Sequence, residues 1–133
     1  MDFMTNETKQ EELEKENDFA LVVAAGEIQL QSGAEISRVE ETMTHMANAL
    51  HLDSLETFII ANGIFATAEG TDHMQRAGMK HISTGSMDLG KIEAVNTLSR
   101  QLEKGEMTKE EAWQRIDEIR KMGDYSSLTQ IVA

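Results

Sequence analysis

LETFIIANGIFATAE, residues 55–69, is the stretch that decides the fold. β-Branched and aromatic residues dominate both of its halves, and the dipeptide Asn62-Gly63 separates them. Asn-Gly is the strongest short-range hairpin signal, because a type I′ turn requires a positive φ at both of its central residues. The stretch therefore predicts two antiparallel strands that turn at this dipeptide.

The position of the turn also predicts which residues of the two strands face each other. The expected pairs, counted outward from the dipeptide, are Ala61 with Ile64, Ile60 with Phe65, Ile59 with Ala66 and Phe58 with Thr67. Phe58, Ile60 and Phe65 then share one face of the sheet, and Ile59 and Ile64 share the other. Since both faces are apolar, we expect helices to cover one of them and helices or a partner to cover the second.

Helical periodicity surrounds the hairpin on both sides. Before it, residues 18–32 are apolar on most sides, as in a helix packed from several directions, and a second helix extends to about Leu50. The elements predicted after it are a polar loop at 70–77, a third strand at 79–83, and helices at 88–105 and 108–122. The fold class predicted is α+β: a small, mostly antiparallel sheet packed with about four helices, in the order α-α-β-β-β-α-α.

Capping residues predict where the helices begin and end. The expected start signals are Ser32 with Glu35 for the second helix, Asp88 for the third, and Thr108 with Glu111 for the fourth. Gly33 is expected to end the first helix, and Gly123 the fourth. The buried residues expected in the second and third helices are Ile36, Val39, Met43, Met46, Ala47 and Leu50, and Leu89, Ile92, Val95, Leu98 and Leu102.

Composition limits the classes of function. The chain of 133 residues carries a formal net charge of −12 and contains no cysteine. Such a charge repels phosphate backbones, so nucleic-acid binding is excluded, and the lack of cysteine excludes disulfides and thiolate zinc sites. No apolar stretch reaches the roughly 20 residues of a membrane-spanning helix, so we expect a soluble chain. We divide it into a charged leader (1–17), a single α+β domain (18–123) and a terminal segment (124–133).

The densest polar group of the sequence stands at the start of the second helix. Its members are Glu35, Arg38, Glu40 and Glu41. Arg38 can bind a carboxylate through its guanidinium fork, and the acids can meet an ammonium group. Alternatively, the four residues only favour the helix terminus and form ion pairs one turn apart. Asn96 is the fifth candidate, because an asparagine inside a helix is either exposed or hydrogen-bonded to a specific partner.

Motifs for metals and nucleophiles are absent from the sequence. The histidines match no zinc spacing, and although Glu41 and His45 stand four residues apart, two ligands do not make a site. No Gly-x-Ser-x-Gly elbow and no phosphate-binding glycine loop occurs. We therefore expect no catalytic residue, no metal and no cofactor. A metal-dependent hydrolase-like domain that acts on small amino-acid substrates remains the alternative.

Residues 26–42, GEIQLQSGAEISRVEET, resemble the opening motif of the threonine/serine exporter (ThrE) family, and of its YjjP-like members in particular. Further features of the same family follow in order. They are a hydrophobic strand at 58–61, a Leu-x-Lys-x-x-Ala-Val-Asn run at 89–96 and a Gly-Glu-x-Thr-x-Glu-Glu-Ala element at 105–112. The resemblance spans about residues 18–122.

The resemblance implies the N-terminal domain of a bacterial inner-membrane exporter, on the cytoplasmic face of that membrane, and not an enzyme. The exported metabolites would be threonine and serine, or a dicarboxylate such as succinate. The domain would contribute substrate binding, gating or subunit assembly. Its partners would be the small amino or carboxylic acid, a transmembrane portion of the same protein that residues 124–133 begin to approach, and a second small membrane subunit. In an assembly role, a further copy of the chain would be the partner.

Overall fold

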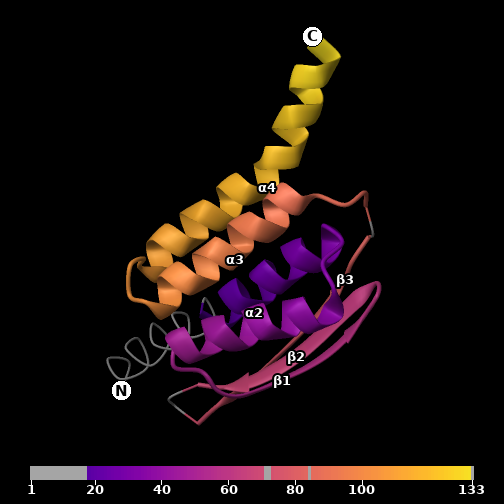
Figure 1. Ribbon diagram of the computed structural model, residues 1–133. Helices are drawn as coiled ribbons and strands as arrows, with labels where there is room; N and C mark the ends of the chain where they lie inside the picture. The colour runs from indigo at the N-terminus through magenta and orange to yellow at the C-terminus, as the bar shows by residue number, and fades with distance from the viewer. Residues whose placement is uncertain (1–17, 71–72, 84, 133) are drawn as a thin grey trace, which may run out of the picture.

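The computed structural model describes residues 18–70, 73–83 and 85–132, and for residues 123–132 it describes the backbone alone. The predicted leader lies outside the described residues. A first helix covers residues 18–31. The elements that follow are α2 (Ile36–Ala49), β1 (Asp53–Ile60), β2 (Gly63–Glu69), β3 (Gln75–His81), α3 (Leu89–Glu103) and α4 (Lys109–Val132) (Figure 1). The α+β class and the predicted order of elements are confirmed.

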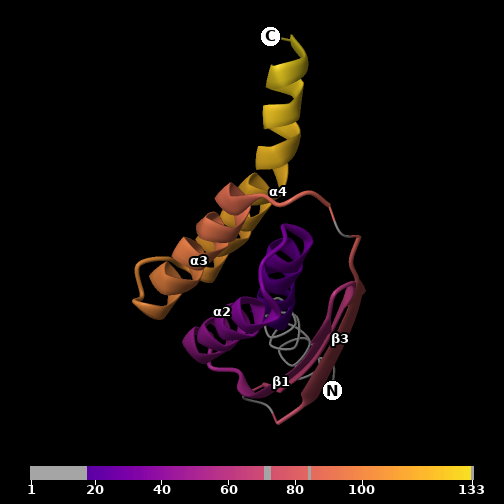
Figure 2. The ribbon, with the colours of Figure 1, turned by 45° about the vertical axis from the view of Figure 1, so that its right-hand side comes forward.

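The elements form three layers. Figure 2 shows the sheet on one side, the first helix and α2 in the middle, and the antiparallel pair α3 and α4 on the other side. The sheet has the strand order β1-β2-β3, and both strand pairs are antiparallel. α2 packs on both β1 and α3, whereas in the described part of the chain the backbones of α3 and α4 do not come close to the sheet. The C-terminal part of α4 extends beyond the other elements (Figure 1).

The first helix is the centre of the hydrophobic core. At Gly26 the helix lies so close to α2 that a Cβ atom would come within 2.5 Å of Met43 Sδ. At the other end, Gly78 of β3 leaves room for the ring of Phe19, which a Cβ would approach to 3.1 Å. The buried residues of this helix include Leu21, Val22, Val23, Ala24, Ala25, Ile28, Gln29 and Leu30. The expectation that the helix is packed from several directions is confirmed.

The hairpin is present, but the predicted register is wrong by two residues. Ile60 pairs with Gly63, and Phe58 pairs with Phe65, so the loop consists of Ala61 and Asn62. Neither loop residue has a positive φ, so the turn is not of type I′. Gly63 is instead part of the ladder, because it pairs with Ile60 and His81, while the Asn62 carbonyl accepts a hydrogen bond from Ile82 N at 2.8 Å.

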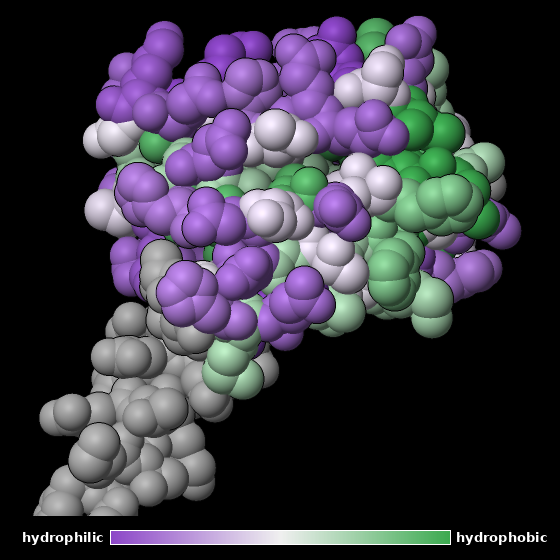
Figure 3. All heavy atoms as spheres, turned by 90° about the horizontal axis from the view of Figure 1, so that it is seen from below, coloured by the Kyte–Doolittle hydropathy of each residue, from purple (hydrophilic) through white to green (hydrophobic). Residues whose placement is uncertain are grey.

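A slip of two residues keeps every side chain on its predicted face, because side chains alternate with a period of two. Ile59 and Ile64 are buried against the helices. Phe58, Ile60 and Phe65 lie on the opposite face and are 68%, 48% and 45% exposed. Within the described residues no helix covers this second face, so of the two covers expected for it only a partner remains as a prediction. Figure 3 shows hydrophobic side chains gathered on one side of the molecule, where this face lies.

The third strand begins earlier than predicted. β3 starts at Gln75 and ends at His81, so the last three residues of the predicted polar loop, 75–77, belong to the strand. The true connection is short: Gly70 N donates to Met74 O at 3.1 Å, and His73, with a φ of 64°, donates through its backbone N to Gly70 O at 2.9 Å. Polar residues are tolerated in β3 because one face of this edge strand is open to water.

Most of the helix boundaries agree with the capping signals. Gly33, with a φ of 94°, ends the first helix, and Thr108 and Glu111 form the predicted capping box through two hydrogen bonds of 3.1 Å. Ser32 is not an N-cap, because α2 begins one turn later with Glu35 as an N-cap residue that makes no side-chain hydrogen bond. Gly123 does not end α4, which continues to Val132.

The predicted buried faces of α2 and α3 are correct except at their first residues and at Leu50, which follows α2 and is only half-buried. Ile36 is 38% exposed and Leu89 is 65% exposed. Each residue is the first of its helix, and the first turn of each helix lies at the edge of the helix layer, beyond the core. The following apolar positions, including Val39, Met43, Ile92 and Val95, are buried.

Asp88 provides a first test of the fold. Its carboxylate accepts a hydrogen bond from Lys91 N at 3.1 Å, and its backbone N donates to Ser32 O at 2.9 Å, so the cap also joins α3 to the end of the first helix. We expect Asp88→Ala to lower the free energy of unfolding by about 0.5–2 kcal/mol, since the N-terminal N–H groups lose their acceptor. Urea denaturation measures this change. Asp88→Asn is the control and should cost much less, because asparagine also caps helices; equal losses would contradict the capping role.

Candidate functional site

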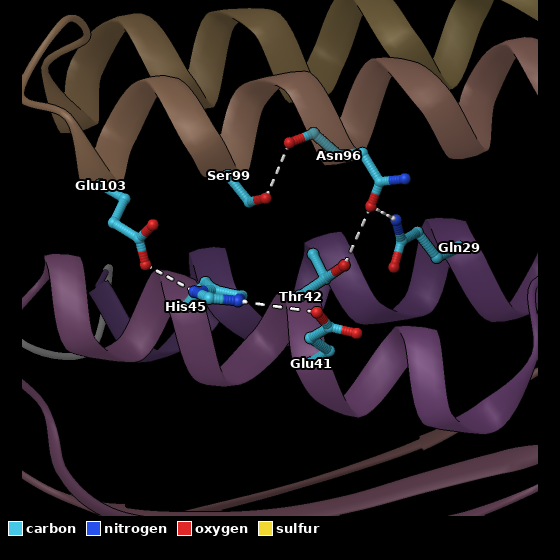
Figure 4. A network of polar contacts seen from close by, with 7 residues as sticks. All are labelled: Gln29, Glu41, Thr42, His45, Asn96, Ser99 and Glu103. Atoms are coloured by element: carbon cyan, nitrogen blue, oxygen red, sulfur yellow. Dashed lines mark hydrogen bonds and ion pairs between the residues drawn. The ribbon is translucent and has the colours of Figure 1, made fainter.

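A buried polar network links the first helix, α2 and α3 (Figure 4). Its centre is Asn96, whose Oδ1 accepts hydrogen bonds from Gln29 Nε2 at 3.0 Å and from Thr42 Oγ1 at 3.2 Å. Ser99 Oγ donates to the Asn96 carbonyl at 2.8 Å, and Gln29 Nε2 also lies 3.3 Å from Ile92 O. These side chains replace apolar packing at the point where the three helices meet.

Asn96 is thus buried and bonded, which is the second of the two possibilities that the sequence left open. The residue is only 6% exposed. Among the described residues, two polar atoms of the network have no hydrogen-bond partner: Asn96 Nδ2 and Gln29 Oε1. An unpartnered buried polar atom costs free energy, so the network stabilises the helix layer although one of its donors and one of its acceptors are unsatisfied.

Above this network a pocket of about 280 Å³ opens between α2 and α3. We call it the α2–α3 pocket. Its lining residues are Glu35, Ser37, Arg38, Glu41, Thr42 and His45 on the α2 side, and Asn96, Ser99 and Arg100 on α3. The spacing explains the arrangement, since positions three and four residues apart share one face of a helix, and the two faces meet here.

The pocket contains both signs of charge. Arg38 and Arg100 supply two guanidinium groups, and Glu35 and Glu41 supply two carboxylates. Within the described part of the chain, Arg38 forms no ion pair and no side-chain hydrogen bond, so the predicted pairing with acids one turn away does not occur. Its guanidinium fork is therefore available for a bound anion.

Four of the five candidate residues from the sequence line this pocket, and the fifth does not. Glu35, Arg38, Glu41 and Asn96 are brought together, although Asn96 is 55 or more residues from the others in the chain. Glu40 is exposed and lies outside the lining. A helix turns by about 100° per residue, so Glu40, two residues before Thr42, lies on nearly the opposite side of α2.

One end of the pocket carries an exposed acid–histidine chain. His45 Nδ1 is hydrogen-bonded to Glu103 of α3, and His45 Nε2 lies 3.9 Å from Glu41 Oε1 (Figure 4). These contacts join α2 to α3 at the surface. The part of the chain that the structure describes holds no group of three or more His, Cys, Asp or Glu side chains arranged to bind a metal ion.

Several pocket residues could not be singled out from the sequence. Ser37, Thr42, Ser99 and Arg100 have ordinary roles on helix surfaces, and only the approach of α2 to α3 makes them neighbours. Gln29 did carry a signal, because it is a long polar side chain inside an otherwise apolar helix. A fully buried glutamine requires a hydrogen-bond partner, and that partner is Asn96.

Comparison with known proteins identifies the family. Residues 18–70, 73–83 and 85–132 include no helix with both the length and the apolar character needed to cross a membrane. No curated protein and no solved structure matches the chain. A family model for threonine/serine exporters (ThrE) matches residues 20–133, which is most of the chain. The family predicted from the motifs at 26–42, 89–96 and 105–112 is thereby confirmed, and the chain belongs to the threonine/serine exporter family.

Proposed function

We propose that this chain is the cytoplasmic domain of an exporter and that its α2–α3 pocket binds the exported threonine or serine. The observation that carries the proposal is the chemistry of the pocket: an unpaired guanidinium, two carboxylates and a floor of hydroxyl and amide groups lie around about 280 Å³. This volume suits a small molecule, and the mixed charges suit a zwitterion. Membership of the exporter family supports the choice of amino acid.

Each group has a role in this proposal. Arg38 binds the α-carboxylate of the amino acid, because a guanidinium fork gives two parallel charge-assisted hydrogen bonds. Glu35 or Glu41 binds the α-ammonium group. The hydroxyl of threonine or serine then lies toward Asn96, which has an unpartnered Nδ2 donor among the described residues. Glu40 has no role in binding, since it lies outside the pocket.

Dicarboxylates fit the same pocket less well. Succinate could place its two carboxylates on Arg38 and Arg100, but Glu35 and Glu41 would then repel its second negative charge. No observation favours the hydrolase-like alternative, because no metal-binding group was found in the described residues and the pocket offers no activated nucleophile.

Transport itself requires a membrane-embedded part, which we propose is a transmembrane portion of the same protein, a second small membrane subunit, or both. The domain would hold the amino acid on the cytoplasmic side and would release it when α2 and α3 separate. At the exposed end of the pocket α2 and α3 are joined by the hydrogen bond between His45 and Glu103. An exposed polar contact exchanges with water at lower cost than a buried one, so a small opening is feasible at this end.

Isothermal titration of the chain with threonine, serine, valine and succinate tests the proposal. We expect threonine and serine to bind with a Kd below about 1 mM, and valine to bind more weakly because it lacks the hydroxyl group. Arg38→Ala should weaken threonine binding by about 10-fold or more, since a hydrogen bond to a charged group contributes about 1.5–3 kcal/mol.

Arg115→Ala is the matched control for Arg38→Ala. Arg115 lies on α4, outside the pocket, and pairs with Glu118 at 3.0 Å. Its removal should leave the affinity for threonine unchanged. Three results would each contradict the proposal: no binding of either hydroxy amino acid, tighter binding of succinate than of threonine, or equal losses in the two arginine variants.

A further inference from the structure

The outer face of the sheet carries a row of large apolar side chains. Phe58, Phe65 and Met79 are direct neighbours across β1, β2 and β3, and Ile60 stands beside them. Their exposed fractions are 68%, 45%, 78% and 48%, in that order. A shallow hollow of about 440 Å³ lies over this row, and Figure 3 shows the hydrophobic surface at this side of the molecule. We call these four residues the outer row.

The outer row is large for a surface that stays in water. An aromatic side chain buries roughly 150–250 Å² when fully enclosed, so at their observed exposures the four side chains present on the order of 400 Å² to solvent. Contiguous apolar patches of this size on soluble chains are generally interaction sites. None of the four residues belongs to the hydrophobic core or lines the α2–α3 pocket.

We propose that the outer face of the sheet binds the same face of a second copy of this chain. The chain has a net charge of −12, but the four side chains of the outer row carry no charge. Two copies can therefore bring the centres of this face together without charge repulsion at that point. A stable interface buries roughly 800 Å² on each partner, of which the outer row provides about half. The flanking polar side chains of the same face supply the rest when two sheets pack face to face.

The charges on the face select one of the two simple two-fold arrangements. Acidic side chains (Asp53, Glu56 and Glu69) gather at the end of the sheet away from the hairpin turn, whereas the outer face at the turn end carries His81 and, among the described residues, no acid. A two-fold axis parallel to the strands would place the acidic end of one copy over the acidic end of the other, where the carboxylates would repel each other. An axis along the outer row places each acidic end over the turn end of the other copy, so this arrangement is favoured.

In the favoured arrangement Phe58, Phe65 and Met79 of one copy each face their own counterpart in the other copy. Met79 of one copy therefore lies over Met79 of the other, at the spacing of about 10 Å between packed sheets. With the axis parallel to the strands, Met79 would instead face Phe58. The two geometries can thus be distinguished by a cross-link at a single position, and the chain contains no cysteine that would interfere.

Sedimentation velocity over a concentration series tests the association. We expect a concentration-dependent dimer that the double variant Phe58→Thr/Met79→Thr weakens by at least about tenfold, because truncation of buried central side chains carries most of the loss at an interface. Threonine keeps the β-propensity of both positions. The control is Met87→Thr, which removes a methionine that is 66% exposed but lies outside the sheet, and it should leave the dimer unchanged.

Cross-linking keeps the test decisive if the double variant folds poorly. Met79→Cys with a short bismaleimide is expected to give a covalent dimer, and Met87→Cys to give none. The proposal is overturned if the wild-type chain remains monomeric up to about 1 mM, or if its dimer survives the double variant. Flotation of a monomeric wild-type chain with phosphatidylglycerol vesicles would also overturn it, in favour of a lipid surface.

Discussion

Replacing Leu98 by alanine is expected to lower the free energy of unfolding by about 2–5 kcal/mol. Leu98 is 1% exposed and is among the largest fully buried side chains of the molecule. It lies on α3 in the main cluster of the core, where the close packing around the first helix leaves little freedom to close a cavity. The midpoint of urea denaturation should fall accordingly, and Tm should fall by on the order of 10 °C.

Leu89→Ala is the matched control for this prediction, since it makes the same change in the same helix. Leu89 is 65% exposed, so its truncation should change the stability by no more than about 0.5 kcal/mol. The pair also tests the boundary of the core, because the apolar periodicity of the sequence assigned both leucines to the buried face. Similar losses from the two variants would show that the first turn of α3 is buried after all.

Asn96→Ala is expected to cost about 2–4 kcal/mol, although it removes few atoms. Asn96 Oδ1 is the shared acceptor for Gln29 Nε2 and Thr42 Oγ1. Without it Thr42 Oγ1 loses its acceptor inside the core, and Gln29 Nε2 keeps only its longer contact with Ile92 O. Gln29 is fully buried and Thr42 is 3% exposed, so neither donor can turn to water without opening the helix layer. Asn48→Ala, at an exposed position of α2, is the control and should be nearly neutral.

A double-mutant cycle distinguishes this network from simple loss of packing. Thr42→Val removes one donor while it keeps the volume of the side chain. In the Asn96→Ala background this second change should cost little or even stabilise the fold, because no unsatisfied hydroxyl remains. Additive losses from the two substitutions would contradict the shared-acceptor arrangement.

The sequence predicts the order of elements well because the signals for it are local. Apolar periodicity locates the helices, and the Asn62-Gly63 dipeptide correctly separates two strands. The register could not be predicted from that dipeptide, because Gly63 is held by pairing with His81 on a third strand that the turn itself does not encode. Likewise, β3 is polar at its start, and its pairing with β2 is a tertiary preference that no local pattern reports.

The site was predictable only on the helix that carries most of its charge. Glu35, Arg38 and Glu41 repeat with helical spacing, so their common face follows from the sequence. The contribution of α3 depends on how α2 and α3 pack together, which the sequence does not report. Asn96 can be predicted as a candidate only because asparagine is unusual inside a helix. Ser99 and Arg100 gave no such signal, although they complete the pocket.

The placement of the first helix has a consequence for how the domain holds together. In the described part of the chain the backbones of the sheet and of the α3–α4 pair do not come close to each other, so the middle layer connects them. Neither the sheet nor the α3–α4 pair can detach without exposing the first helix, which is apolar on most sides, to water. Partial melting from either side is thereby discouraged, and the domain is expected to come apart as one cooperative unit, with the amides of residues 18–31 among the last to exchange with solvent.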